Sequence, residues 1–69
     1  MTPTKPMNHW HVWFRDRKEP VKCVTVDSAP LQAIATASDL IKAGAGARLR
    51  IYLVELLEPD GRTALAWRL

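Results

Sequence analysis

Two histidines flank a tryptophan at His9 and His11, and this is the spacing in the chain that comes nearest to metal-binding chemistry. Residues two apart lie on the same side of a strand, so both imidazoles can approach one ion. A stable zinc site usually needs three or four ligands. Cys23 can supply a third ligand in only one of the two possible registers of the first hairpin. The pattern offers no clear fourth ligand, although Asp27 remains a candidate for it. We therefore expect no metal and no other cofactor.

Catalytic chemistry has no clearer signal. Cys23 is the single cysteine, and it lies among valines, where a thiol behaves as a small hydrophobic side chain. The glycine segment Gly44–Gly46 follows a predicted helix, whereas a phosphate-binding loop precedes one. No base, nucleophile and charge-stabilising group converge in the pattern. The sequence predicts a protein that is not an enzyme.

The composition bounds the size and class of the protein. Its 69 residues are 48% hydrophobic, which is too apolar for a disordered chain, and too few for a cofactor domain beside a substrate domain. We expect a flexible leader over residues 1–7 and a single domain over residues 8–69. A lone cysteine, without an apolar signal core or a membrane-length apolar run, predicts a cytoplasmic protein with no membrane association. The formal net charge of +3 permits nucleic acid as a partner without requiring it.

The first two strands are predicted from alternation and from β-branched and aromatic content. Asn8–Arg15 and Val21–Val26 form a hairpin around a charged turn that ends at Pro20. A turn of even length gives one face of this hairpin the side chains of Trp10, Val12, Phe14, Val21 and Cys23. The other face then carries His9, His11, Trp13, Arg15, Lys22, Val24 and Val26. A turn of odd length exchanges the faces of the second strand, and the sequence leaves both registers open.

A helix is expected over Ala29–Ala43, with Ser28 or Asp27 as its cap and Pro30 in its first turn. Gly44 is a suitable residue to end it. The apolar stripe of this helix consists of Leu31, Ile34, Ala37 or Ser38, and Ile41, flanked by Ala33 and Leu40. One such stripe can cover one face of a small sheet.

The last two strands are predicted over Ala47–Leu57 and Arg62–Leu69, around the turn Glu58–Gly61. A three-residue loop fixes the expected pairs as Glu58 with Arg62, Leu56 with Ala64, and Val54 with Ala66. The face expected to pack on the helix carries Leu49, Ile51, Leu53, Leu57, Thr63, Leu65, Trp67 and Leu69. The opposite face carries Arg48, Arg50, Tyr52, Val54, Leu56, Ala64, Ala66 and Arg68.

Together these elements predict an α+β fold of the order ββαββ, a four-stranded antiparallel sheet with one helix packed on one face. A helical crossover joins parallel strands with one strand between them, which allows the sheet orders 2-1-3-4 and 1-2-4-3, and we favour the first. Both faces of the sheet keep large apolar side chains, and one helix covers only one of them. The other face, which we call the open face, is expected to be buried by a partner or a second copy.

Aromatic and basic side chains mark the surface expected to bind that partner. They are His11, Trp13, Arg15, Arg48, Arg50, Tyr52 and Arg68. Aromatic rings beside arginines suit a protein interface, and they also suit single-stranded nucleic acid, on which rings stack and guanidinium groups hold phosphates. The aliphatic residues between them favour contact with a protein. Face-to-face pairing into a homodimer is a third interpretation.

One stretch and the order of elements resemble known proteins. Val24–Ala35 resembles the strand-to-helix junction of many small phage-encoded proteins, and His9–Leu69 resembles, as a pattern of elements, small anti-CRISPR inhibitors of type I systems. The resemblance implies a non-enzymatic protein of phage or mobile-element origin that acts in the bacterial host cytosol. It implies steric inhibition of a host defence complex, such as a type I CRISPR effector. Many such inhibitors mimic DNA with acidic surfaces; the net charge of +3 departs from that pattern, and no motif position matches that would carry over a functional residue.

Overall fold

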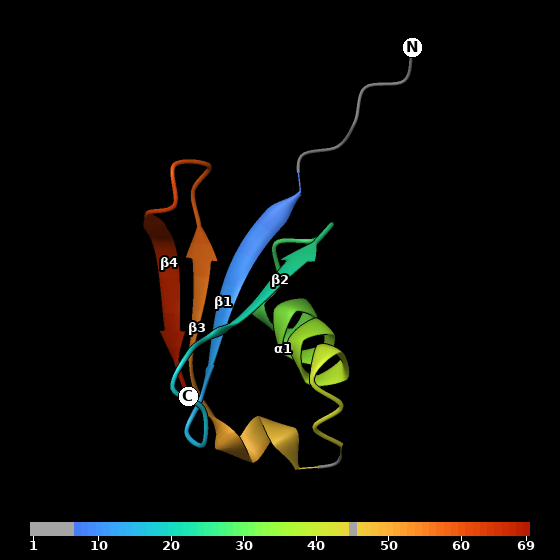
Figure 1. Cartoon of the computed structure of the whole chain (residues 1–69). Coiled ribbons are helices and arrows are strands. Elements are labelled where there is room, and N and C mark those ends of the chain that lie inside the picture. The colour runs from blue at the N-terminus through green and yellow to red at the C-terminus, as the bar shows by residue number, and fades with distance from the viewer. Residues whose placement is uncertain (1–6, 45) are drawn as a thin grey trace.

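The computed structural model describes residues 7–44 and 46–69. Its elements, in chain order, are β1 (Asn8–Phe14), β2 (Val21–Thr25), α1 (Pro30–Leu40), the 3₁₀ helix η1 (Ala47–Arg50), β3 (Ile51–Leu57) and β4 (Thr63–Arg68). The four strands form one antiparallel sheet in the order β2-β1-β3-β4 (Figure 1). This confirms the expected α+β fold and the favoured sheet order. Apart from Met7, which is exposed, the predicted leader lies outside the described residues.

The first hairpin has the register that an even-length turn produces. Trp10 lies opposite Cys23, and both are buried together with Val12 and Phe14. Bulky side chains at every second position are what a pleated strand with one buried face requires. The indole N–H of Trp10 would be costly to bury without a partner, and it donates to Thr25 Oγ1 at 2.7 Å. The centre of the core is therefore apolar, with this polar pair satisfied inside it.

The helix α1 packs against this hairpin, mainly on β2 (Figure 1). Pro30 occupies its first turn as expected, since proline lacks the N–H that would stay unpaired there. The predicted cap at Ser28 or Asp27 is wrong, because Ala29 occupies the cap position and no side chain caps the helix. The linker before the helix is held instead by Thr25, whose hydroxyl donates to the Asp27 carbonyl.

The helix ends at Leu40, before the predicted end at Ala43. Lys42 has a φ of 50°, a left-handed conformation that cannot continue an α-helix, and the Ala43 N–H donates back to the Ser38 carbonyl at 3.0 Å. The buried side of α1 consists of Ala33, Ile34 and Ala37. Leu31 lies about a third of a turn away from Ala37 and is 62% exposed, so its predicted place in the buried stripe is wrong.

The second hairpin keeps its predicted loop but not its predicted register. The Glu58 N–H donates to the Arg62 carbonyl at 2.7 Å, as a three-residue loop requires. A register shift next to Leu57 then adds one residue to β4. Because of this bulge, the predicted pairs Leu56–Ala64 and Val54–Ala66 are replaced by Leu56–Leu65 and Val54–Trp67.

A second register shift lies where β3 begins, opposite Trp13 and Phe14. Ala47–Arg50 forms η1 and not the expected strand, so the ladder starts at Ile51, and Tyr52 is the extra residue of the shift. A shift of one residue moves every following side chain to the other face. The predicted faces of β3 beyond this point are therefore wrong, with Val54 and Leu56 on the helix side and Leu53 and Leu57 on the open face.

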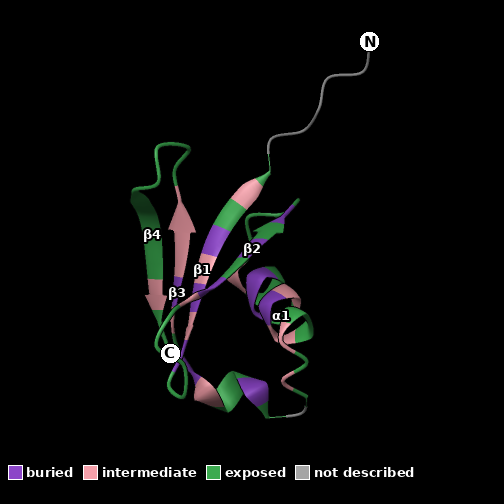
Figure 2. Cartoon of the chain, in the orientation of Figure 1, coloured by how far each residue is buried: buried purple, intermediate pink, exposed green. Residues whose placement is uncertain are grey.

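Burial is uneven across the sheet (Figure 2). β1 and β2 place alternate side chains in the core, whereas every residue of β4 is exposed except Trp67, which is partly covered. The rings of Trp67 and Trp10 pack at 5.8 Å between centroids. Because α1 lies mainly over β2, the helix side of β4 stays largely uncovered, and Leu65 is 56% exposed there, whereas β3 buries Ile51 and Val54 on that side. We call Leu56, Leu65 and Trp67 the uncovered flank.

Candidate functional site

The open face of the sheet is a grid of side chains from all four strands. Its first row is Val24, His9, Leu57 and Thr63. Its second row is Lys22, His11, Glu55 and Ala66, and its third is Trp13, Leu53 and Arg68. Paired residues within a row have Cβ atoms about 5 Å apart. The middle of this grid is partly apolar, with one carboxylate at its centre.

Glu55 holds two side chains of the open face. Its Oε1 accepts a hydrogen bond from Trp13 Nε1–H, and its Oε2 accepts one from Thr63 Oγ1–H at 2.9 Å. Thr63 is predicted from the sequence for the helix side, and the bulge in β4 brings it to this face. With both carboxylate oxygens engaged, the indole of Trp13 is oriented before any partner arrives.

Three of the predicted partner-binding residues lie together on this face. His11 is in the second row, directly opposite Glu55. Trp13 and Arg68 are in the third row, separated by Leu53. His11 and Trp13 are half-buried and Arg68 is exposed. An oriented aromatic ring next to an aliphatic side chain and an arginine has the composition of an interface hot spot.

Two other predicted residues, Arg15 and Arg50, lie at one end of the sheet. The Arg15 N–H donates to the Arg50 carbonyl at 2.7 Å, which joins the first turn to η1. The Arg50 guanidinium is engaged with Asp16 at 2.8 Å and donates to the Ala43 carbonyl at 3.3 Å. Arg50 therefore ties the first turn, the segment after α1 and η1 together, which is a structural role.

Arg48 is also separated from the grid, whereas Tyr52 lies in β3 beside the third row. Arg48 lies on η1, where it lines a groove of about 290 Å³ together with Arg15, Leu49, Ile51 and Leu69. Tyr52 occupies the register shift of β3 and is 36% exposed. The predicted placement of Arg48 and Arg50 on the open face is thus wrong, because η1 replaces the regular strand that would have put them there.

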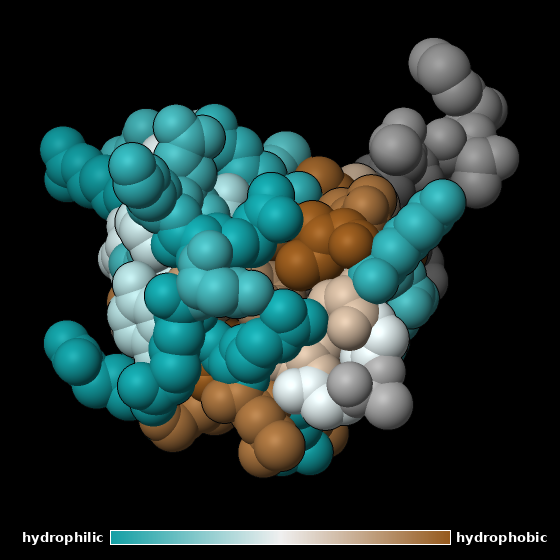
Figure 3. All heavy atoms as spheres, turned by 60° about the horizontal axis from the view of Figure 1, so that its bottom comes forward, coloured by the Kyte–Doolittle hydropathy of each residue, from teal (hydrophilic) through white to brown (hydrophobic). Residues whose placement is uncertain are grey.

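The formal net charge is concentrated around the first turn and η1, a region that we call the basic end. Its charged residues are Arg15, Arg17, Lys18, Arg48 and Arg50, with Asp16 and Glu19. The other five basic and five acidic residues of the sequence cancel, so the whole +3 belongs to this region. Figure 3, with this end turned forward, shows hydrophilic side chains beside separate hydrophobic patches. The most exposed large apolar residue of the region is Leu49, at 84%.

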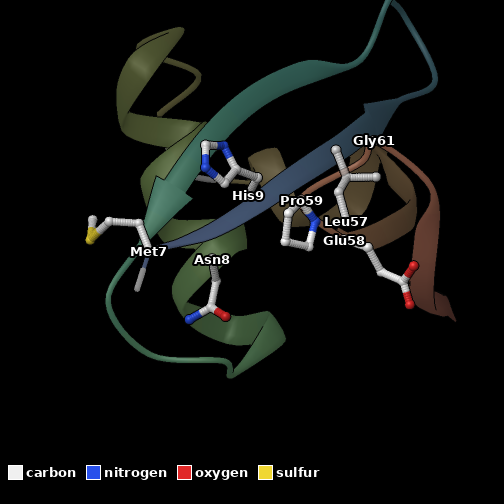
Figure 4. Close-up of a pocket in the computed structure, with 7 residues that line it drawn as sticks. All are labelled: Met7, Asn8, His9, Leu57, Glu58, Pro59 and Gly61. Carbon is white, nitrogen blue, oxygen red and sulfur yellow. The ribbon is translucent and has the colours of Figure 1, made fainter. Parts of the chain in front are cut away.

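The far end of the open face holds a hollow of about 470 Å³ (Figure 4). It is lined by Met7, Asn8, His9, Leu57, Glu58, Pro59 and Gly61. His9 and Leu57 belong to the first row of the grid, so the hollow continues the open face. Asn8 points to the other side of β1, and its amide donates to the Val26 carbonyl at 3.0 Å. The open face therefore has an oriented ring, Trp13, toward one end and a depression at the other.

The cysteine and the two histidines lie on opposite sides of the sheet. Cys23 is buried on the helix side, whereas His9 and His11 are on the open face. Within residues 7–44 and 46–69, no three His, Cys, Asp or Glu side chains come close enough to share a metal ion. Burial raises the pKa of the Cys23 thiol, which makes it a poorer source of thiolate, and its S–H donates to the Ala33 carbonyl at 3.6 Å.

Comparison with protein-family models found no match, and searches of curated proteins and of solved structures found none either. Among the described residues, no helix combines the length and the apolar character that crossing a membrane requires. A functional proposal therefore rests on the open face and the basic end.

Glu55 is the residue of the open face that sequence reasoning missed. It lies inside the apolar run Ile51–Leu57, and carboxylates are depleted from strand interiors. The signal that could have identified Glu55 is that it is the single charged residue in this run. Such a residue indicates that its face of the strand is not fully buried and that its carboxylate accepts hydrogen bonds from neighbouring side chains. Its partners, Trp13 and Thr63, are far from it in sequence and become its neighbours only through strand pairing.

Proposed function

We propose that this protein binds another protein through the open face of its sheet and acts by occlusion, not by catalysis. The observation that carries the proposal is the Glu55 carboxylate, which holds Trp13 in place on the side of the sheet away from α1. A ring that is oriented in advance loses little entropy on binding. Tryptophan and arginine are also the residues in which binding energy concentrates at protein interfaces. Trp13 is the anchor, and Arg68 is the charged residue at its rim.

The charge of the open face favours a protein over a nucleic acid. Glu55 places a negative charge at the centre of the grid, where a phosphate backbone would meet it. The two neighbouring residues of β3 on this face, Leu53 and Leu57, suit apolar side chains of a partner. The hollow beside His9 gives such a side chain a place to enter.

Capture of cytosolic bacterial proteins on immobilised chain tests the proposal. Wild type is compared with Trp13→Ala and with Leu31→Ala, which truncates an exposed residue of α1 as a matched control. We expect at least one protein that wild type and Leu31→Ala retain and that Trp13→Ala binds about tenfold or more weakly. If no captured protein distinguishes the two variants, while circular dichroism shows both folded, the open face is not the binding surface.

The resemblance to anti-CRISPR inhibitors supplies one class of target, a type I effector. The assay measures binding of a purified type I effector to its target duplex with increasing amounts of the protein. Inhibition that is lost in Trp13→Ala and kept in Leu31→Ala would support this target. Unchanged duplex binding at an excess of protein would reject the effector as the target, and the capture experiment would still decide the wider proposal.

Nucleic-acid binding at the basic end is a second candidate function, and the concentration of the whole +3 charge there favours it. Arg15 and Arg48 are exposed and line the same groove. Affinity for a single-stranded oligonucleotide should then fall steeply with added salt. The double variant Arg15→Ala/Arg48→Ala should weaken it, and Trp13→Ala should not. Undetectable binding at low salt would exclude this function.

A further inference from the structure

We infer that two copies of this chain join through their β4 strands, so that their sheets form one continuous sheet about a two-fold axis. β4 is an edge strand, paired on one side with β3. Its six residues include no proline and one charged residue, Arg68. A nearly uncharged edge without proline is a ready template for pairing with another strand.

The opposite edge of the sheet, β2, is protected against the same event. Its inner side is packed under α1, and the exposed Lys22 lies on its other side. A covering helix and an exposed lysine are two of the means by which proteins block edge pairing. β4 has neither, and its Leu65 is 56% exposed beside the partly covered Trp67. We therefore expect the seam at β4.

The hydrogen-bond phase of β4 limits the register of the pairing. The Leu69 N–H donates to the Tyr52 carbonyl at 3.1 Å, so the backbone groups of residue 69 face β3. This direction alternates along an antiparallel ladder, and the N–H and C=O groups of Ala66 and Arg68 therefore face the free side. Two symmetric registers use these groups, one with Trp67 opposite Trp67 and one with Ala66 opposite Ala66 of the second copy, and we adopt the second. Leu65 then lies opposite Trp67, and Arg68 lies opposite Ala64.

This register is self-complementary on both faces of the sheet. On the helix side the two uncovered flanks meet, and Leu65 of each copy packs beside Trp67 of the other. On the open face Arg68 lies next to Thr63 of the second copy, and the Glu55 carboxylate of that copy is bonded to this threonine. The seam therefore brings opposite charges together and keeps the two arginines apart. These features fit a second copy of the chain as the occupant of the edge.

The pairing leaves the open face available for another partner. Both open faces lie on the same side of the joined sheet, because a two-fold axis through the seam is perpendicular to it. Each dimer then presents Trp13 twice to one side. The dimer does not depend on the proposed protein binding, since it uses the edge, the uncovered flank and the β4 margin of the grid and does not contact Trp13, the proposed anchor.

Sedimentation equilibrium tests the inference on the full chain. At a concentration on the order of 10⁻⁵ M, wild type should have twice the 7.8 kDa mass of the chain. Ala66→Pro removes an N–H that faces away from β3, so it should keep the ladder within the chain and weaken association about tenfold or more. Leu65→Lys should weaken it similarly, whereas Leu31→Lys, at an equally exposed leucine of α1, should leave the mass unchanged.

Two results would overturn the inference. One is a monomeric mass for wild type at about 1 mM, where even a weak dimer would assemble. The other is a dimer that survives both edge variants and dissociates in Val24→Lys, because that dimer would join through its open faces. Leu65→Lys changes an exposed side chain, so it stays informative if Ala66→Pro fails to fold. Trp13→Ala should leave the mass unchanged, which separates failure of the dimer from failure of the proposed function.

Discussion

The β1–β2 hairpin and the β3–β4 hairpin are similar in size and opposite in environment. The first buries alternate side chains along both strands under α1, and the second buries Ile51 and Val54 of β3 but no residue of β4. The two tryptophans on the helix side show the contrast at one point. Trp10 is fully buried, while Trp67, whose ring packs on it, is only partly covered. Stability therefore comes mainly from one half of the molecule, and the other half is the one for which we propose association.

The dimensions of the elements explain this division. An α-helix is about 10 Å across, and strands lie about 4.8 Å apart, so one helix covers roughly two strands. The buried side of α1 is built from Ile34 and the small Ala33 and Ala37, which bring the helix close to the sheet without widening its cover. A four-stranded sheet with one such helix has two strands left over on that side. Here β3 is partly covered, with Ile51 and Val54 buried, and β4, which is also an edge, is the strand that stays uncovered.

Truncating each tryptophan gives the sharpest test of this contrast. Trp10→Ala should cost about 3–5 kcal/mol, because it empties the centre of the core. Trp67→Ala should cost about 1–2 kcal/mol, because its ring is already partly in water. Urea unfolding, at a concentration low enough for the chain to be monomeric, measures both losses. Since the larger loss approaches the whole stability of a small domain, Trp10→Phe provides a milder version. Equal losses at the two positions would show that both hairpins share one core.

The two hydrogen-bonded threonines extend the test to polar groups. Thr25→Val leaves the buried Trp10 N–H without its acceptor and should cost about 1–3 kcal/mol. Thr63→Val removes an exposed hydroxyl from Glu55, where water can replace it, and should cost less than about 0.5 kcal/mol. Thr25→Ser keeps the hydroxyl and serves as the control. Urea unfolding of the three variants measures the difference, and a Thr63→Val loss as large as that of Thr25→Val would contradict the division.

The same division separates what the sequence predicts well from what it does not. The strict alternation from Asn8 to Val26 and the turn around Pro59 identify the hairpins, and a helix between them limits the sheet to two orders. The faces of β3 are not predictable in this way. Ala47–Arg50 alternates small or apolar with basic residues as a strand does, yet it forms a 3₁₀ helix. Each of the two single-residue bulges then depends on contacts between strands, which no local pattern records.

The candidate site is predictable to the same extent. His11 and Trp13 belong to the regular hairpin, and the sequence places them on the open face correctly because no irregularity intervenes before Phe14. Arg48 and Arg50 fail for the opposite reason, since η1 carries them to the basic end. Arg68 and Ala66 reach the open face as predicted, because the two register shifts each exchange faces and their effects cancel in β4. The cross-strand neighbour of Arg68 is Leu53, which the sequence places on the other face. The faces of β3 beyond the first bulge are therefore the part of the site that the sequence pattern does not assign.

The smallest effect concerns the thiol at the contact between β2 and α1. Burial raises the pKa of Cys23 above its ordinary value of 9.0, so the unfolded chain ionises first as the pH rises. The contribution of this group is therefore fully present below about pH 9 and is lost above it, as the pH rises toward the folded-state pKa. Urea unfolding at increasing alkaline pH should show a small loss of stability in wild type that Cys23→Ala lacks.

The same thiol reports local opening, because alkylation by iodoacetamide requires Sγ to leave its contact with the Ala33 carbonyl. If β2 and α1 form the stable half, labelling will be as slow as global unfolding; labelling that is much faster would mean that this half opens by itself, and the contrast between the hairpins would be reversed.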